Sequence, residues 1–205
     1  MQCSKKKRDS RSAGPRFKQI CPETLEPYNN TETVPGRVVF LGTLHPKVNP
    51  DVIRNVAELP EVSECIVIGD GPRRSELDEL AEAVDSLRVT GRLPDDEAFP
   101  LLASAAVAIN PQYGSDLQVA SSPVKLYYYA ALGRPMVLTE GPELVETLAD
   151  AGAAVAIEPD GAFVDAVQEL LSDDDRLSAM GDTARNAGRE STWNRRTDQL
   201  VDVYS

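Results

Sequence analysis

Four residues near the middle of the chain, Ser122 to Lys125, have the types and spacing of an anion-binding helix start. Ser122 can cap the helix and Pro123 fits its first turn, where free backbone N–H groups attract negative charge. Lys125 lies in the same turn, although a cation there opposes the helix dipole unless an anion is present. The stretch therefore predicts a phosphate-binding helix start. A lysine that only extends its ammonium group to solvent is the alternative.

Glycine-containing turns follow several predicted strands and could approach the same ligand. In open parallel α/β sheets, ligands bind outside the carboxyl ends of the strands, and glycine permits close backbone approach. The alternative is that each glycine only serves a tight turn between a strand and a helix. The candidate turns are Gly42-Thr43, Gly69-Asp70-Gly71-Pro72, Gly91-Arg92, the loop at 112–122 and Thr139-Glu140.

Three consecutive tyrosines (127–129) follow Lys125 on the same predicted helix. At helical spacing they point in three directions about 100° apart, so they cannot all line one pocket or all enter the core. Val124 shares a stripe with Tyr127, which predicts that Tyr127 packs inward. Tyr128 falls on the side of Lys125, where it could contact the ligand or be exposed at the surface.

Six short apolar runs alternate with helical patterns from residue 36 onward, which is typical of a parallel α/β sheet. Asn49 is expected to cap the first of these helices, and Pro100 predicts a late start or a kink in the third. The right-handed crossover rule then predicts a single Rossmann-like, doubly wound parallel sheet of about six strands with helices on both faces. We expect an α/β domain over residues 37–205 and an irregular basic and polar segment over residues 1–36.

The net charge of −12 over 205 residues argues against a nucleic-acid partner. Seven of the 21 basic residues lie in the first eighteen positions, a tail that could touch acidic lipid but is otherwise solvated. Only Lys47 and Lys125 follow Lys18, and an acidic, lysine-poor body suggests a salt-rich cytoplasm, with ordinary acidity as the alternative. Three cysteines without paired spacing indicate reduced thiols, and no run is apolar enough for a membrane span or a signal peptide. We expect a cytoplasmic protein, at most peripheral to the inner face of the membrane.

The order of these motifs resembles the C-terminal, donor-binding domain of glycosyltransferases with the GT-B fold, of the retaining GT4 type (group 1 family). The resemblance covers residues 36–205 and is carried by VVFLGTL, CIVIGDGP, LRVTGRLPDDEAFPLLASAAVAINP, SSPVKLYYYAALGRPMVLT and the terminal STW. It implies a nucleotide-diphosphate sugar as donor substrate, with no further cofactor and no metal site. The donor-binding residues that it implies are Gly42, Thr43, Asp70, Gly71, Gly91, Arg92, Ser122, Pro123, Val124, Lys125 and Tyr128.

The sequence departs from this family's pattern at several implied contacts. Tyr128 stands where relatives carry a glutamate that reaches the ribose, and Ala120 stands where a second glutamate is expected. Thr43 replaces an arginine that neutralises the diphosphate, a role that only Lys47 or Arg73 could take over. Tyr128 is then either a weakened ribose contact or a surface residue.

No catalytic residue can be assigned, because the resemblance places acceptor binding and the catalytic histidine in a separate N-terminal domain. His45 could be a general base, an oxyanion partner or a donor contact, and Asp116 could meet sugar hydroxyls or simply be exposed. Three functions are therefore open. The chain is the donor-binding part of a transferase that needs a separate acceptor domain, or a non-catalytic nucleotide-sugar-binding module or inactive remnant, or an unrelated nucleotide-binding domain.

Overall fold

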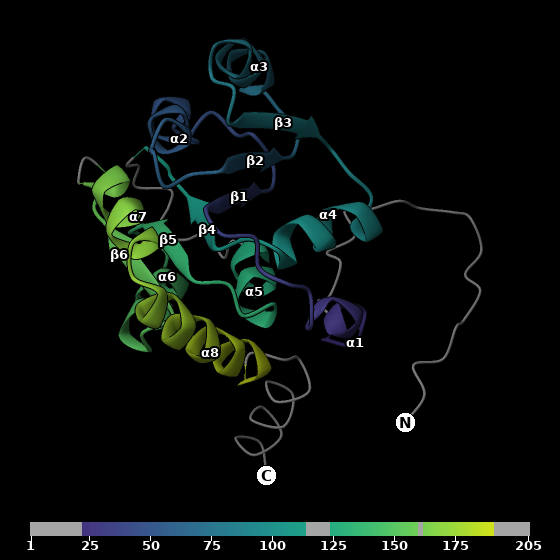
Figure 1. Cartoon of the computed structure of the whole chain (residues 1–205), viewed down its shortest axis with the longest axis vertical. Helices are drawn as coiled ribbons and strands as arrows, with labels where there is room; N and C mark the ends of the chain where they lie inside the picture. Colours follow the sequence, from purple (N-terminus) through teal and green to yellow (C-terminus); the bar gives the residue numbers. More distant parts are fainter. Residues whose placement is uncertain (1–21, 114–123, 160–161, 191–205) are drawn as a thin grey trace, which may run out of the picture.

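A six-stranded parallel β-sheet forms the centre of the protein (Figure 1). The computed structural model describes residues 22–113, 124–159 and 162–190. The strands are β1 (Arg37–Leu41), β2 (Glu64–Ile68), β3 (Leu87–Gly91), β4 (Val107–Asn110), β5 (Met136–Thr139) and β6 (Ala154–Ile157). They lie in the order β3-β2-β1-β4-β5-β6, and every neighbouring pair is parallel. This is the order of a doubly wound Rossmann-like sheet, so the predicted fold class is confirmed.

Helices connect the strands and cover both faces of the sheet (Figure 1). None of those within the described ranges is both long and apolar enough to cross a membrane. They are α1 (Pro22–Leu25), the 3-10 helix η1 (Glu26–Tyr28), α2 (Pro50–Ala57), α3 (Arg74–Ala83), α4 (Asp95–Ala103), α5 (Val124–Ala131), α6 (Glu143–Asp150), α7 (Phe163–Leu171) and α8 (Asp174–Glu190).

The start of α2 shows how local sequence fixes an element. The side chain of Asn49 accepts a hydrogen bond from the backbone N–H of Val52 at 3.2 Å, and Pro50 occupies the first helical position. Proline has no N–H to leave unsatisfied there, and its φ angle is already helical. The predicted cap at Asn49 is therefore confirmed.

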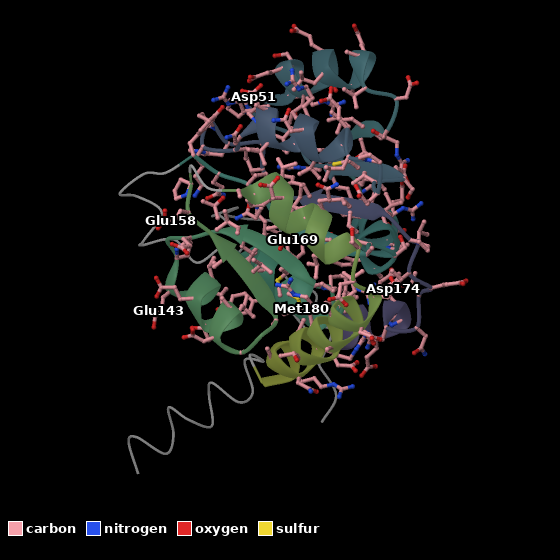
Figure 2. The ribbon with its side chains drawn as sticks, turned by 60° about the vertical axis from the view of Figure 1, so that its left-hand side comes forward. Asp51, Glu143, Glu158, Glu169, Asp174 and Met180 are labelled. Atoms are coloured by element: carbon pink, nitrogen blue, oxygen red, sulfur yellow. The ribbon has the colours of Figure 1, made fainter. Side chains whose placement is uncertain are left out.

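Two apolar cores lie on the two faces of the sheet. Because side chains alternate along a strand, Val38 and Phe40 of β1 enter the core under α2, α3 and α7, whereas Val39 enters the core under α1, α4, α5 and α6. Helix α8 contributes to both cores: Met180, labelled in Figure 2, belongs to the first and Ala184 to the second. The last described helix thus connects the two layers.

Two expectations from the sequence need correction. Residues 1–36 are predicted to be irregular, but residues 22–28 form α1 and η1, and Leu25 is buried in the core of the domain with 2% of its surface exposed. Pro100 does not delay α4, which begins at Asp95 and continues past the proline to Ala103. Pro100 lies inside α4, where its missing N–H removes one backbone hydrogen bond without ending the helix.

Strands β1 and β4 separate toward their carboxyl ends. Their register pairs only Val38 with Val107 and Val39 with Ala108, whereas β1 pairs with β2 over all five of its residues. Beyond that point the phenolic oxygen of Tyr129 accepts a hydrogen bond from the backbone N–H of Leu41 at 2.9 Å and lies 3.3 Å from the carbonyl oxygen of Ile109. A crevice therefore begins where the strand order reverses, the position at which open α/β sheets bind ligands.

Candidate functional site

A cleft of about 470 Å³ lies at the carboxyl end of β1, where strands β1 and β4 separate. The loop after β1 forms one wall, the loop after β3 and the start of α4 form a second, and the first turns of α5 form a third. A smaller hollow of about 190 Å³ adjoins it and shares the residues after β1 and β3. The cleft is lined by Leu41, Gly42, Thr43, His45, Lys47, Leu93, Asp95, Ala98, Phe99, Gln112, Val124, Lys125 and Tyr128.

The side chain of Lys125 crosses the base of this cleft. Its Nζ donates a hydrogen bond to Oδ1 of Asn110 at 2.9 Å and lies 4.2 Å from the centre of the Phe40 ring. Asn110 is the last residue of β4, and its Oδ1 also accepts from Nε2 of Gln112 at 3.3 Å. No carboxylate among the described residues forms an ion pair with this ammonium group. Among the described residues, Lys125 is thus held by a neutral amide and an aromatic ring, and the carboxylate that lines the same cleft is that of Asp95.

Gly42 is required for this arrangement. Its φ angle is +139°, and a Cβ atom there would lie 3.0 Å from Cε and 3.1 Å from Nζ of Lys125. A side chain at residue 42 would therefore both strain the backbone and push the lysine away. The glycine turn and the lysine, which lie 83 positions apart in the sequence, form one unit.

The surroundings make the charged form of Lys125 unfavourable. Burial, and to a smaller extent the nearby positive charge of Lys47, lowers the pKa of its ammonium group to about 7. Both lysines line the cleft. A bound anion would oppose both effects, because an adjacent negative charge favours the protonated form.

The tyrosine that enters the core is not the one that the sequence predicts. The buried one is Tyr129, not Tyr127: its ring is fully buried, and burial raises the pKa of its hydroxyl. Val124, expected on the inward stripe with Tyr127, is 40% exposed. The predicted inward stripe of Val124 and Tyr127 is wrong, because helix α5 is rotated so that Leu126, Tyr129 and Ala130 face the sheet.

Tyr128 lines the cleft beside Lys125, so the structure places it on the side predicted for a ligand contact. Its ring packs against Phe99 at a centroid distance of 5.2 Å, and Phe99 packs in turn against Tyr28 at 5.9 Å. A row of three aromatic rings thus runs from η1 through α4 to α5. It forms an apolar wall on which a planar group could stack.

The loop after β2 supports the cleft from its side. Asp70 lines the adjoining hollow, and its Oδ1 accepts from the N–H of Gly71 at 2.8 Å. A Cβ on Gly71 would lie 2.7 Å from the carbonyl oxygen of Leu44, so this glycine lets the loops after β1 and β2 pack together. Gly71 itself lines neither the cleft nor the hollow. Its role is in the turn.

Of the two candidate residues in the loop after β3, one lines the adjoining hollow and the other only allows close packing. Arg92 is exposed and lines the adjoining hollow. Gly91 has a φ angle of +77°, and a Cβ there would lie 2.6 Å from Nη1 of Arg74, so it again serves the turn. The structure therefore brings Gly42, Thr43, Val124, Lys125 and Tyr128 together in the cleft, with Asp70 and Arg92 in the adjoining hollow. Ser122 and Pro123, with Asp116 and Ala120, lie outside the described residues.

Of the two cations proposed to replace the arginine missing at residue 43, only Lys47 lines the cleft. The guanidinium of Arg73 instead donates to the carbonyl oxygen of Pro46 at 3.0 Å, pairs with Glu76 at 2.6 Å and lies 5.6 Å from the centre of the Tyr113 ring. It holds the loop that carries Lys47 rather than facing the cleft. His45 also lines the cleft, from the same loop.

Sequence reasoning missed two residues that define the site, Asn110 and Phe99. Asn110 could have been noticed as a polar residue ending the otherwise apolar strand AVAIN, next to the predicted ligand edge. Phe99 lies in a helix pattern that reads as an ordinary core face, and nothing in its sequence neighbourhood separates a core residue from one that also lines a cleft.

Comparison with known sequences gives a consistent family. Residues 35–173 match the model of a family described as glycosyl transferases group 1. A D-inositol 3-phosphate glycosyltransferase of Corynebacterium urealyticum is 26% identical over 181 residues, which are 80% of this chain and 42% of that protein. A protein of the same description from Rhodococcus opacus is 28% identical over 191 residues, 82% of this chain and 40% of that protein. The chain therefore spans less than half the length of these relatives.

Solved structures are similar over a comparable part of their length. Sucrose-phosphate synthase of Thermosynechococcus elongatus has a TM-score of 0.69 at 16% identity, over 92% of this chain and 49% of that chain. HepE of Anabaena, in complex with UDP, has a TM-score of 0.66 at 13% identity, over 91% and 53%. The C-terminal domain of a group 1 glycosyl transferase from Francisella tularensis has a TM-score of 0.61 at 13% identity, over 83% and 91%. At these identities the likeness concerns the fold, which matches half of a GT-B fold.

Proposed function

Because this chain belongs to the group 1 glycosyltransferase family, we propose that it binds the donor of a retaining, GT4-like transferase. The donor is a nucleotide-diphosphate sugar, from which the sugar passes to an acceptor with its anomeric configuration kept. Family membership removes the third alternative, an unrelated nucleotide-binding domain. The finer assignments rest on the cleft at the carboxyl ends of the strands and on the cations in it.

The observation that supports the proposal most directly is the position of Lys125. Its ammonium group is held by Asn110 and Phe40, has no carboxylate partner among the described residues, and lies in a cleft with Lys47. Burial lowers the pKa of Lys125, and a second cation lies nearby, so the charged form of this lysine is unfavourable alone and becomes favourable when a diphosphate lies between the two lysines. The body of the chain otherwise nearly excludes lysine.

The remaining parts of the donor are assigned by the family pattern. The diphosphate lies against Gly42, Thr43 and Lys125, and the base approaches the loop at Gly91 and Arg92. Tyr128 faces the ribose, where its hydroxyl can donate or accept a hydrogen bond but cannot supply the charge of a glutamate. The end of the Lys125 side chain occupies the space that a side chain at residue 42 would take, so a phosphate beside Gly42 also lies near the ammonium group.

Transfer requires a second domain in this proposal. The relatives are more than twice as long as the part that this chain matches, and positioning of both substrates supplies much of a transferase's rate. The acceptor therefore binds a separate N-terminal-type domain, which approaches the cleft from the side of the exposed Val124. The reaction itself is a displacement at the anomeric carbon in which the nucleoside diphosphate leaves.

The test is a thermal-shift panel of UDP, GDP and their sugars at high salt. We expect at least one nucleotide to raise the melting temperature of the parent protein, and Lys125→Met to abolish that rise. Arg54→Met is the matched control, since Arg54 is an exposed cation on α2 away from the cleft. A parent protein that responds to none of the nucleotides, or a response that Lys125→Met leaves intact, contradicts the donor site.

A second function is favoured by one residue, Tyr128, which replaces the glutamate of the family pattern in the cleft. A donor site without that carboxylate could hold a nucleotide-sugar without transferring it, as a binding module or an inactive remnant. Mixing the protein with a cognate acceptor domain and assaying transfer separates the two. Transfer supports the enzyme, whereas nucleotide binding without transfer under any pairing supports the binding module.

A further inference from the structure

A second cavity, of about 400 Å³, lies at the opposite edge of the sheet from the cleft and shares no lining residue with it. Gly36, Ala106 and Pro135, which immediately precede β1, β4 and β5, form its floor. Helix α8 forms its roof with a face that includes Asp174 and Gly181. Figure 2 shows Asp174 on the side away from Glu158, which follows the carboxyl end of β6. A cavity of this size can hold a small metabolite.

Arg134 supplies a buried cation to this cavity. Only 8% of its surface is exposed, and three hydrogen bonds hold its guanidinium: Nε donates to the carbonyl oxygen of Leu132 at 3.0 Å, and Nη1 donates to that of Ala105 and to Oγ1 of Thr33, both at 2.9 Å. All three acceptors are neutral. Burial normally requires a charged group to be paired, yet no carboxylate of the described chain forms an ion pair with Arg134.

Arg185 brings a second guanidinium to the same cavity from α8. It packs on the turn before β5, where a Cβ on Gly133 would lie 2.7 Å from its Nη2, and its one side-chain hydrogen bond is a long one, 3.4 Å to Oδ1 of Asn29. The proximity of Arg185, after burial as the larger cause, lowers the pKa of Arg134 to about 10. The two cations therefore repel one another across the cavity.

This pair shares the lack of an ion pair with Arg92, Arg176 and Arg189 but differs from five other arginines of the described residues. The guanidiniums of Arg37, Arg54, Arg73, Arg74 and Arg88 all lie within 4.0 Å of a carboxylate. In a chain with 33 acidic residues, carboxylates are abundant. Neither Arg134 nor Arg185 forms an ion pair with a described carboxylate, so an anion from outside could pair with both.

Two carboxylates line the cavity farther out. Asp174 and Asp182 both lie on α8 and are exposed, and neither forms an ion pair with a described residue. Carboxylates repel a polyanion and accept hydrogen bonds from hydroxyl groups. A ligand that satisfies both ends of the cavity carries one phosphoryl group and several hydroxyls.

We propose that this cavity binds a small phosphomonoester of a polyol. Arg134 and Arg185 hold the phosphoryl oxygens, and Asp174 and Asp182 accept from the hydroxyl groups. Arginine suits this role because its planar fork can donate two parallel hydrogen bonds to phosphate. The site is independent of the donor cleft, so each can fail without the other.

The test is isothermal titration calorimetry of the full chain, at fixed ionic strength, with glycerol 3-phosphate, inorganic phosphate and glycerol. We expect glycerol 3-phosphate to bind more tightly than inorganic phosphate, and glycerol not to bind. Arg185→Gln should weaken glycerol 3-phosphate binding at least tenfold, since it removes a charge-assisted hydrogen bond to the phosphoryl group. Arg176→Gln, an exposed position on the same helix with the same change of charge, should leave it unchanged.

Two further measurements separate loss of this site from loss of folding and from an effect on the donor cleft. Arg134→Lys retains the charge but cannot reproduce the fixed fork, so it should weaken binding while circular dichroism shows a folded protein. UDP titration of Arg185→Gln should match that of the parent, because Arg185 is remote from the cleft. The proposal is overturned if glycerol 3-phosphate at millimolar concentration releases no binding heat, or if Arg185→Gln and Arg176→Gln behave alike.

Discussion

Gly42 and Lys125 fit together because residue 42 has no side chain: a Cβ there would lie 3.0 Å from Cε of the lysine. The lysine in turn reaches Oδ1 of Asn110 at 2.9 Å only by crossing the space above the glycine. The turn after the first strand and the start of α5 are thereby coupled through one side chain. A substitution of Gly42 should consequently change the position of the Lys125 ammonium group.

Gly42→Ala tests this coupling. We expect the new methyl group to displace Lys125 from Asn110, so that nucleotide affinity falls about tenfold through loss of a charge-assisted contact. Stability should also fall by about 1–3 kcal/mol, because alanine is strained at a φ angle of +139°. Calorimetric titration with the nucleotide found in the thermal-shift panel, together with urea unfolding, measures both effects.

Gly152→Ala is the control for backbone strain alone. Gly152 also has a positive φ angle, +79°, but nothing lies within 4 Å of the added Cβ. The Gly152→Ala variant should be less stable than the parent and should bind the nucleotide with the same affinity. If both variants bind as the parent does, the glycine does not act through the lysine.

The pKa of about 7 for Lys125 predicts a pH dependence of nucleotide binding. A bound diphosphate raises this pKa toward its ordinary value, so at pH 8 binding must be accompanied by proton uptake. Affinity should be level just below pH 7 and fall by up to tenfold per pH unit above it, because the free protein loses the proton that the complex retains. Titrations in buffers of different ionisation enthalpy measure the uptake directly. Lys125→Met should take up no proton, and equal uptake by that variant would assign it to another group.

The same lysine affects stability without ligand. Its pKa is lowered in the folded state from 10.5 to about 7, so the unfolded chain binds a proton that the folded chain has released throughout this interval. The contribution of Lys125 to the free energy of unfolding should therefore rise with pH from about 7 and become level above its unfolded pKa. Urea unfolding at several pH values, compared with Lys125→Met, isolates this contribution. A difference that does not change with pH would contradict the lowered pKa.

Tyr129→Phe tests the hydrogen bond between α5 and β1. Removing the hydroxyl leaves the part-buried N–H of Leu41 without its acceptor, which should cost about 1–3 kcal/mol of stability. The control is Tyr113→Phe, which removes a hydroxyl from an exposed tyrosine (37%) and keeps the ring beside Arg73. Urea denaturation compares the two. Equal small losses would show that the phenol of Tyr129 is not a structural acceptor.

Leu25→Ala tests whether the segment before β1 belongs to the domain. Leu25 is 2% exposed and lies in the core under α4 and α5, so truncation to alanine should cost about 2–5 kcal/mol. Thr24→Ala, at an exposed neighbouring position, should be close to neutral. A loss no larger than that of the threonine variant would mean that residues 22–28 only rest against the surface.

The sequence predicts the sheet well because each strand is a short apolar run between turn residues, a signal that depends on neighbouring positions alone. The cap at Asn49 is predictable for the same reason. The rotation of α5 is different: Val124 and Tyr127 form as plausible an inward stripe as Leu126 and Tyr129 do. Only the packing of the helix against β1 and β4, where Tyr129 meets Leu41, decides between them.

The residues of the candidate site are likewise only partly predictable from the sequence. Lys125 and Gly42 could be named from their types and their places after predicted strands, because the carboxyl edge of a parallel sheet collects such residues. Asn110 gives one signal, a polar residue at the end of an apolar strand, whereas Phe99 could not be distinguished from an ordinary helix position. Their roles come from contacts with residues far along the chain, 15 positions away for Asn110 and 29 for Phe99.

Helix α8 has a consequence for how the domain comes apart. It places Met180 in one core and Ala184 in the other. If α8 detached, both apolar cores would become exposed to water at the same time. The two layers then cannot melt one after the other while the helix is in place. We expect one sharp transition on heating, with amide protection in the layers lost together.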